Sequence, residues 1–161
     1  MWAYYNLTMY IATLCIDAYL KRALRFSPQA HIVRHRCTKT VPRLVLLDAN
    51  ALLMPFQFQV HLDAELRRVI GDVDIAVPTP VMAELDLLAD HDRNARAAQK
   101  LAKKYRLVEG HGSADDALLD LASQQRAVVV TNDQPLLDRL KAAGIPRVFL
   151  RSRNHLVAEG L

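Results

Sequence analysis

The sequence predicts an α/β fold in which a mainly parallel central sheet is flanked by helices. Short aliphatic runs recur through residues 41–161, and each is followed by a segment with helical spacing of its apolar residues. Continuous aliphatic runs are typical of strands that are covered on both faces, as in parallel sheets. Strands that alternate with helices indicate the α/β class. A chain of 161 residues is long enough for one such domain with a substantial core.

The strands are expected where aliphatic residues cluster and turn residues follow. They lie at residues 44–47, 74–77, 107–108, 127–130 and 147–150, and we expect the last of these to be the final strand. The sequence Pro78-Thr79-Pro80 closes the second strand.

The helices are expected between these strands, where apolar residues recur every three to four positions. They lie at residues 49–56, 61–70, 81–89, 94–105, 113–122 and 136–143. Pro55 is expected to end the first helix, and Gly71 and Gly144 to stop two others. Ser113, followed by two aspartates, is typical of the residue that caps a helix N-terminus.

The positive charge of the chain is concentrated at its N-terminus. Residues 1–43 hold seven of the 21 Lys and Arg residues and one of the 17 acids, so the remainder has 14 basic residues against 16 acidic ones. The pI of about 9.3 therefore belongs to this segment and says nothing direct about the main domain. Two cysteines are too few for a disulfide framework, which favours a cytoplasmic location.

Residues 1–40 differ from the rest and are expected to form an N-terminal extension, with the domain itself at residues 41–161. The apolar spacing in residues 7–18 predicts an amphipathic helix, and a basic linker begins at Ser27-Pro28. Polar residues interrupt the apolar stretch, so no membrane association is expected. An alternative is that translation starts near residue 41, which would make this segment an artefact of gene prediction.

Four acidic positions stand out because each lies where a strand gives way to a helix. Asp48 and Asp133 follow aliphatic strands, and Glu84 lies one turn into the helix after Pro80. Asp116 opens another helix, with Asp115 beside it. In open α/β sheets, ligands bind outside the carboxyl ends of the strands, so we expect these acids to share one edge. The plainer interpretation is that Asp115 and Asp133 only cap helices and that Glu84 is solvated.

Carboxylates gathered at neutral pH repel one another unless a cation compensates their charge. Oxygen ligands suit Mg²⁺ or Mn²⁺, whereas zinc prefers Cys and His. Such an ion suits phosphodiester cleavage, because it activates water and offsets phosphate charge. On this hypothesis Asp48 is the central ligand, Glu84 and Asp116 complete the shell or orient the water, and Asp133 serves a second ion or an outer shell.

Residues 42–155 resemble the PIN-domain nucleases. Four motifs carry the resemblance: VLLDAN at 45–50, VMAEL at 81–85, ADDALL at 114–119 and VTND at 130–133. The resemblance implies a three-layer PIN-like fold and an Mg²⁺- or Mn²⁺-dependent endoribonuclease. It implies Asp48, Glu84 and Asp116 as catalytic residues and the same three with Asp133 as metal ligands. Between the adjacent aspartates, Asp116 is favoured because its spacing to Leu118-Leu119 matches family helices.

The sequence can be assigned to either of two branches of this family. The double Asp115-Asp116 and the segment after Thr131 look like archaeal relatives of endonucleases that process ribosomal RNA. Toxin ribonucleases of toxin–antitoxin pairs commonly carry an Asp-Phe pair downstream of that strand, which this sequence lacks. The processing branch is therefore favoured.

If the chain processes ribosomal RNA, the expected partners are RNA and a pre-ribosomal particle. If it is a toxin, the expected partner is an antitoxin protein. A homodimer is a further candidate assembly. A PIN-like scaffold that assists ribosome assembly without cutting is a third alternative, although scaffolds usually lose one or more acids. An aspartyl-phosphate phosphatase is disfavoured, because Asn50 stands where a second Asp is needed.

A basic stripe occurs at helical spacing in the helix expected at residues 94–105 and just before it. Its members are Arg93, Arg96, Lys100 and Lys103. The stripe could follow an RNA backbone, where each neutralised phosphate adds salt-dependent affinity. The alternative is an ordinary solvated helix face.

Overall fold

The computed structural model describes residues 43–161, and the extension expected at residues 1–40 lies outside this range. The described residues contain one six-stranded sheet with the order β3-β2-β1-β4-β5-β6. Its strands are β1 (Arg43–Leu47), β2 (Val73–Pro78), β3 (Arg106–Val108), β4 (Val128–Val130), β5 (Arg147–Arg151) and β6 (His155–Glu159). All neighbouring strands are parallel except β5 and β6.

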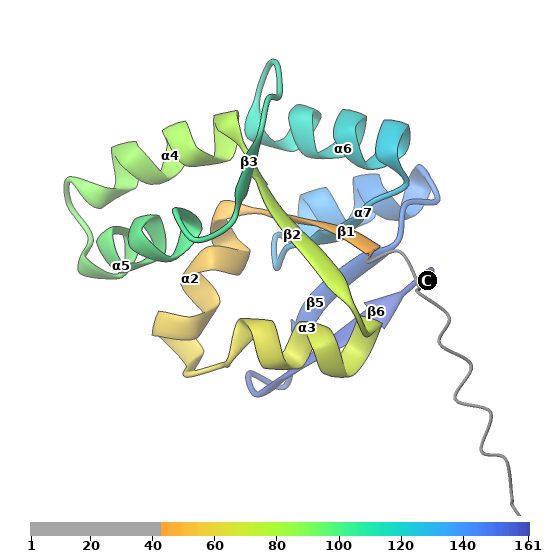
Figure 1. Cartoon of the computed structure of the whole chain (residues 1–161), viewed down its shortest axis with the longest axis horizontal. Coiled ribbons are helices and arrows are strands. Elements are labelled where there is room, and N and C mark those ends of the chain that lie inside the picture. Colours follow the sequence, from red (N-terminus) through yellow and green to blue (C-terminus); the bar gives the residue numbers. More distant parts are fainter. Residues whose placement is uncertain (1–42) are drawn as a thin grey trace, which may run out of the picture. The chain divides into compact units, whose positions relative to one another are not determined.

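Helices lie on both sides of this sheet. They are α2 (Ala49–Phe58), α3 (Leu62–Ile70), α4 (Thr79–Ala89), α5 (Arg93–Ala102), α6 (Ala114–Gln125) and α7 (Gln134–Ala142). Figure 1 shows α6 on one side of β1 and β2 and α3 on the other. The predicted class, a three-layer α/β fold with a mainly parallel sheet, is confirmed.

The strand order places a topological switch next to β1. From β1 the chain adds β2 and β3 on one side, and it then crosses back to place β4 on the other side. In open α/β sheets the crevice at such a switch, outside the carboxyl ends of the strands, is where ligands bind. Here the crevice lies between the ends of β1 and β4.

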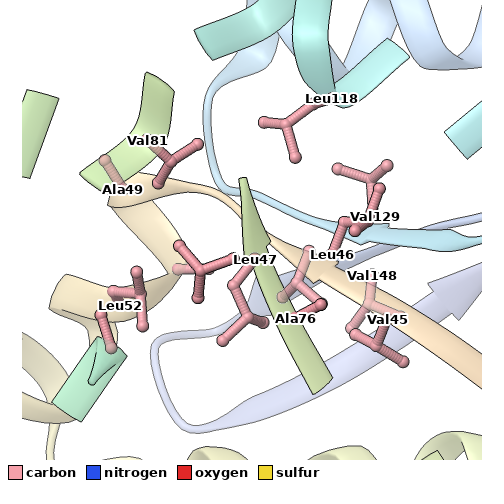
Figure 2. Packing of buried hydrophobic residues seen from close by; sticks show 14 of the residues in the cluster. Val45, Leu46, Leu47, Ala49, Leu52, Ala76, Val81, Leu118, Val129 and Val148 are labelled. Atoms are coloured by element: carbon pink, nitrogen blue, oxygen red, sulfur yellow. The ribbon is translucent and has the colours of Figure 1, made fainter. Parts of the chain in front are cut away.

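The centre of the core is β1. Val45, Leu46 and Leu47 are inaccessible to solvent, which explains why this strand is a continuous aliphatic run. In the sheet, Leu46 lies between Ala76 of β2 and Val129 of β4, and Figure 2 shows these side chains packed together. The run of apolar residues ends at Asp48, so the tightly packed strand holds this aspartate at the edge of the sheet.

The sequence-based expectations missed one strand and placed the end of one helix too early. The chain has a further strand, β6, after the one expected to be last, and it pairs antiparallel with β5. A tight turn joins them, with Ser152 and Arg153 at positive φ. Helix α2 continues through Pro55 to Phe58. Proline removes one helical hydrogen bond, and the buried residues Ala51–Met54 hold the helix in place despite that loss.

Candidate active site

Asp48 is held rigidly at the carboxyl end of β1. It caps helix α2, and the Ala49 backbone N–H donates to its Oδ1 at 2.7 Å. The Thr131 hydroxyl donates to Oδ2 at 2.6 Å, and the Asn50 side-chain amide lies 3.4 Å from the same oxygen. Only 4% of Asp48 is exposed. Burial raises the pKa of this carboxyl, and the hydrogen bond from Thr131 partly opposes that rise.

Thr131 is a site residue that the sequence analysis did not single out. It follows β4 directly, is fully buried, and donates to Asp48 while its oxygen accepts from the Asp133 backbone N–H at 3.0 Å. One hydroxyl thus connects two of the acids across the topological switch. The signal that could have found it is a single hydroxyl residue placed between three buried valines and an aspartate.

Asp133 caps a helix and also lies near the other acids. Its carboxylate caps α7 by accepting from the Leu136 backbone N–H at 3.1 Å. The same carboxylate lies close enough to the other acids to contribute to the raised pKa of Glu84. The capping contact fixes the orientation of the side chain, which remains half-buried at the edge of the sheet.

The pKa of Glu84 is affected by the other acids at this edge of the sheet. It lies on the exposed side of α4, which starts directly after β2. Its pKa is raised, first by partial burial and then by the negative charges of Asp48, Asp115 and Asp133. The carboxylates that follow β1, β4 and the β3–α6 loop therefore all act on this one side chain.

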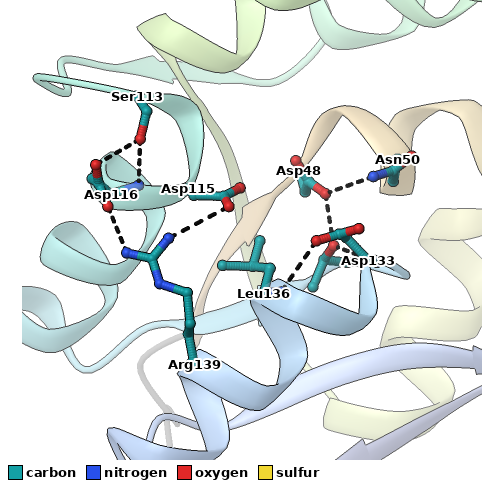
Figure 3. Close-up of polar contacts among 9 residues, drawn as sticks. Asp48, Asn50, Ser113, Asp115, Asp116, Asp133, Leu136 and Arg139 are labelled. Carbon is teal, nitrogen blue, oxygen red and sulfur yellow. Dashed lines mark hydrogen bonds and ion pairs between the residues drawn. The ribbon is translucent and has the colours of Figure 1, made fainter.

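The two adjacent aspartates of α6 face different surroundings. Asp115 contributes to the raised pKa of both Asp48 and Glu84, so its charge acts on the group of acids. Asp116 instead accepts from the Ser113 hydroxyl at 2.7 Å and from Arg139 at 2.5 Å. Figure 3 shows Asp115 directed toward Asp48, and Asp116 directed away from it toward Ser113 and Arg139. The preference for Asp116 over Asp115 is not supported by this placement.

The difference follows from helix geometry. Successive residues of an α-helix point about 100° apart, so only one of two neighbours can face a given site. Ser113 caps the helix and bonds the Asp116 backbone N–H at 3.2 Å, which holds Asp116 on the outer side. Sequence spacing alone did not resolve this rotation.

The gathered carboxylates suit a hard divalent cation, although they do not form a closed cage. Within residues 43–161, no three His, Cys, Asp or Glu side chains are close enough to form a preassembled metal centre. Mg²⁺ is usually held by one or two carboxylates together with waters and substrate phosphates. An all-oxygen donor set fits that pattern, and within it the pKa values of Asp48 and Glu84 are raised by burial and by neighbouring negative charge.

A hollow of about 580 Å³ adjoins Glu84 between the beginnings of α4 and α6. Its lining includes Pro80, Leu87 and Ser113 besides Glu84 itself. The hollow places apolar surface beside the acids.

The basic stripe predicted on α5 is exposed along that helix. None of Arg93, Arg96, Lys100 and Lys103 takes part in an ion pair within residues 43–161. In the part of the chain that the structure describes, no helix is long and apolar enough to cross a membrane.

Several known proteins are similar to this chain. Ribonuclease VapC4 of Methanocaldococcus jannaschii is 28% identical over 128 aligned positions, and the match covers 73% of this chain and 97% of that protein. Ribonuclease VapC9 of Archaeoglobus fulgidus is 26% identical over 122 residues, covering 73% and 90%. Among solved structures, the PIN domain endonuclease Utp24 is 26% identical with a TM-score of 0.65, and the match covers 74% of this chain and 93% of that one.

The family model described as "PIN like domain" matches residues 45–153. This range contains the second half of β1, the four motifs and all the acids discussed above. Nucleases of this family generally use divalent metal ions, in keeping with the donor set. The predicted enzyme class, a PIN-domain nuclease, is thereby confirmed: the chain belongs to the PIN-like domain family.

Proposed function

We propose that the chain is an endoribonuclease that needs Mg²⁺ or Mn²⁺ to hydrolyse RNA phosphodiesters. The observation that carries this proposal is the placement of the acids: Thr131 links Asp48 to Asp133 at the carboxyl edge of the sheet, and Asp115 is directed toward Asp48 (Figure 3). The raised pKa of Glu84, caused first by partial burial and then by the charges of Asp48, Asp115 and Asp133, agrees with this placement. Four carboxylates from separate segments of the chain that gather at a sheet edge are costly for the fold unless a cation compensates them. A similar ribonuclease from each of two archaea supports RNA as the substrate.

Each acid has a distinct role in this proposal. Asp48 is the central ligand, because its hydrogen bonds fix one carboxylate orientation. Asp115 and Glu84 complete the shell or orient the attacking water, and Asp133 serves a second ion or an outer shell. When bound, the metal lowers the pKa of a water and offsets charge on the attacked phosphate. Asp116, predicted as a ligand from the sequence, becomes a supporting residue.

The RNA strand is expected to extend from the acids over the neighbouring surface. The hollow beside Glu84 offers apolar contact at Pro80 and Leu87. The basic stripe along α5 and its C-cap offers four exposed basic side chains. If the stripe contacts phosphates, neutralising Arg96 and Lys100 will flatten the dependence of RNA affinity on salt concentration. An unchanged slope would assign the stripe to ordinary solvated surface.

For the biological role we propose processing of ribosomal RNA in the cytoplasm, with a pre-ribosomal particle as partner. The double Asp115-Asp116, the missing Asp-Phe pair and the likeness to the endonuclease Utp24 support this role. The second candidate is a toxin ribonuclease with an antitoxin partner, which the likeness to VapC4 and VapC9 favours. A toxin should arrest growth when expressed alone, whereas a processing enzyme should not and should co-purify with pre-ribosomal particles.

The central experiment measures cleavage of RNA by the purified full chain with Mg²⁺, with Mn²⁺ and with excess EDTA. We expect cleavage with either ion, none in EDTA, and none in Asp48→Asn with its fold retained. Asp138→Asn is the matched control, since Asp138 is an exposed acid on α7 that bonds Gln134. Full activity in EDTA or in Asp48→Asn would overturn the metal assignment, and RNA binding without any cleavage would favour a scaffold.

A further inference from the structure

One arginine contacts both aspartates at the start of α6. Arg139 extends from α7 and donates from Nη2 to Asp116 Oδ1 at 2.5 Å. Its Nη1 lies 3.5 Å from Asp115 Oδ2. Figure 3 shows the guanidinium between these two carboxylates. A single side chain thus connects the outward aspartate with the one that faces the other acids.

The placement of Arg139 is fixed mainly through Asp116. Asp116 accepts from both Arg139 and the Ser113 hydroxyl, and these contacts hold the pKa of its carboxyl below its usual range. The contact with Asp115 is longer, so it is the weaker of the two. Ser113, Asp116 and Arg139 therefore form a chain of contacts that ends on Asp115.

Asp115 is also the carboxylate of α6 whose charge acts on Asp48 and Glu84. Within residues 43–161, no other lysine or arginine forms an ion pair with Asp48, Glu84, Asp115 or Asp133. Arg139 is thus the protein's own positive charge at the edge of the acid group. It offsets part of the repulsion that the acids exert on one another.

We propose that Arg139, anchored by Asp116, is an internal counterion that holds Asp115 and that a bound divalent cation must displace. The inference rests on the proposed function, because it takes the acids to be a metal centre. A metal bound through Asp115 and the guanidinium compete for the same carboxylate. Arg139 is therefore a positioning residue that lowers the affinity for metal and stabilises the metal-free protein.

The test measures binding of Mn²⁺ to the full chain by calorimetry, together with thermal melting in EDTA. Arg139→Gln removes the competitor, so it should bind Mn²⁺ about two- to fivefold more tightly, the range expected for one exposed ion pair. It should also melt at a lower temperature than wild type in EDTA, because the acids lose their countercharge. Unchanged or weaker Mn²⁺ binding by a folded Arg139→Gln would overturn the proposal.

Arg106→Gln is the matched control. Arg106 is 51% exposed and pairs with Asp74 at 2.9 Å, while the Arg139 side chain is 46% exposed. Both Asp74 and Arg106 lie at the amino ends of their strands, whereas the acids follow the carboxyl ends. The same loss of charge and of an ion pair should therefore leave Mn²⁺ affinity unchanged. If Arg106→Gln gains as much Mn²⁺ affinity as Arg139→Gln, the effect comes from the change in net charge, and the proposal is overturned.

Asp116→Asn tests the anchor. Without Asp116 the guanidinium of Arg139 loses its stronger contact and is no longer held beside Asp115, so Mn²⁺ should bind more tightly, as in Arg139→Gln. The Asp116→Asn/Arg139→Gln double variant should bind no more tightly than Arg139→Gln alone, since no guanidinium is left to compete. If Asp116→Asn weakens binding in both backgrounds, Asp116 is itself a ligand and the proposed anchor is overturned.

The experiment also separates this inference from the proposed function. If wild type binds Mn²⁺ and Arg139→Gln does not bind it more tightly, the counterion role fails while the metal-dependent nuclease stands. If wild type binds neither Mn²⁺ nor Mg²⁺, the metal centre itself is wrong, and both proposals fall together.

Discussion

The hydroxyl of Thr131 donates a 2.6 Å hydrogen bond to the Asp48 carboxylate, across 83 positions in the sequence. Both residues are almost completely buried. Because Asp48 follows β1 and Thr131 follows β4, the bond spans the topological switch of the sheet. It fixes the central acid of the candidate site and joins it to the beginning of α7.

Replacing this hydroxyl should lower the stability of the fold and change the pKa of the Asp48 carboxyl. Thr131→Val keeps the shape of the side chain but leaves the buried Asp48 oxygen without its donor. We expect a loss of about 1 to 3 kcal/mol in the free energy of unfolding and a further rise in the pKa of Asp48. Urea unfolding and the pH dependence of Mn²⁺ binding measure the two effects. Thr131→Ser retains the donor, and a loss as large in Thr131→Ser would assign the effect to packing.

The acid group should make the metal-free protein less stable as pH rises. The pKa of Glu84 is raised in the folded state above its ordinary value of 4.5. Between these two values the native state binds more protons than the unfolded state, so the free energy of unfolding falls as pH rises. The penalty is absent below 4.5 and complete above the folded-state pKa. In EDTA, Glu84→Gln should therefore melt above wild type at pH 7.5, and the difference should shrink toward pH 4.5.

Asp86→Asn serves as the control for this pH experiment. Asp86 is an exposed acid on the same helix, but its carboxylate bonds Gln99 and not the acids of the site. Its removal should leave the pH dependence of melting unchanged. Saturating Mn²⁺ should abolish the advantage of Glu84→Gln, because the cation takes over the compensation. An advantage that persists in Mn²⁺ would show that Glu84 does not face the metal.

The two adjacent aspartates should differ in their effect on RNA cleavage. Asp115 acts on the other acids, whereas Asp116 is held by Ser113 and Arg139. At saturating Mn²⁺ we expect Asp115→Asn to lower the cleavage rate by more than about 100-fold and Asp116→Asn by no more than about tenfold. Initial rates on a labelled RNA measure both. The reverse order would restore Asp116 as the principal ligand, as the sequence alone had suggested.

The unexpected strand β6 depends on a contact with α3. Glu65 accepts from the Leu156 backbone N–H at 2.9 Å and from Arg68, and these contacts lower the pKa of Glu65 to about 2. Glu65→Ala leaves the buried N–H without an acceptor, at a cost of about 1 to 3 kcal/mol, while the exposed Arg68 pair adds little. Thermal melting and hydrogen exchange at Leu156 measure the loss.

The pH dependence of this contact has the opposite sign to that of Glu84. Because the pKa of Glu65 is lowered from 4.5, its stabilisation is present above pH 4.5 and is lost as pH falls toward 2. Wild type and Glu65→Ala should therefore converge in acid. Glu109→Gln, which changes an exposed acid in the β3–α6 loop, is the control and should match wild type at every pH.

The sequence by itself determined the fold class and the position of most elements. The aliphatic run at residues 44–47 is buried on both sides, so its composition identified it as a central strand without any knowledge of its partners. Asp48, Glu84 and Asp133 were selected as candidate site residues in the same way, because each interrupts or follows an apolar segment at a strand-to-helix transition. Local composition is sufficient wherever burial alone dictates the residue type.

Only the tertiary structure decided which side chains meet. Asp115 and Asp116 are equivalent in composition, and the capping of α6 by Ser113 and the approach of Arg139 from α7 determine which one faces Asp48. Thr131 gains its role from the pairing of β4 with β1, and β6 forms because β5 and Glu65 provide its partners. These roles depend on contacts between segments distant in the chain, so local sequence alone does not determine which side chains meet.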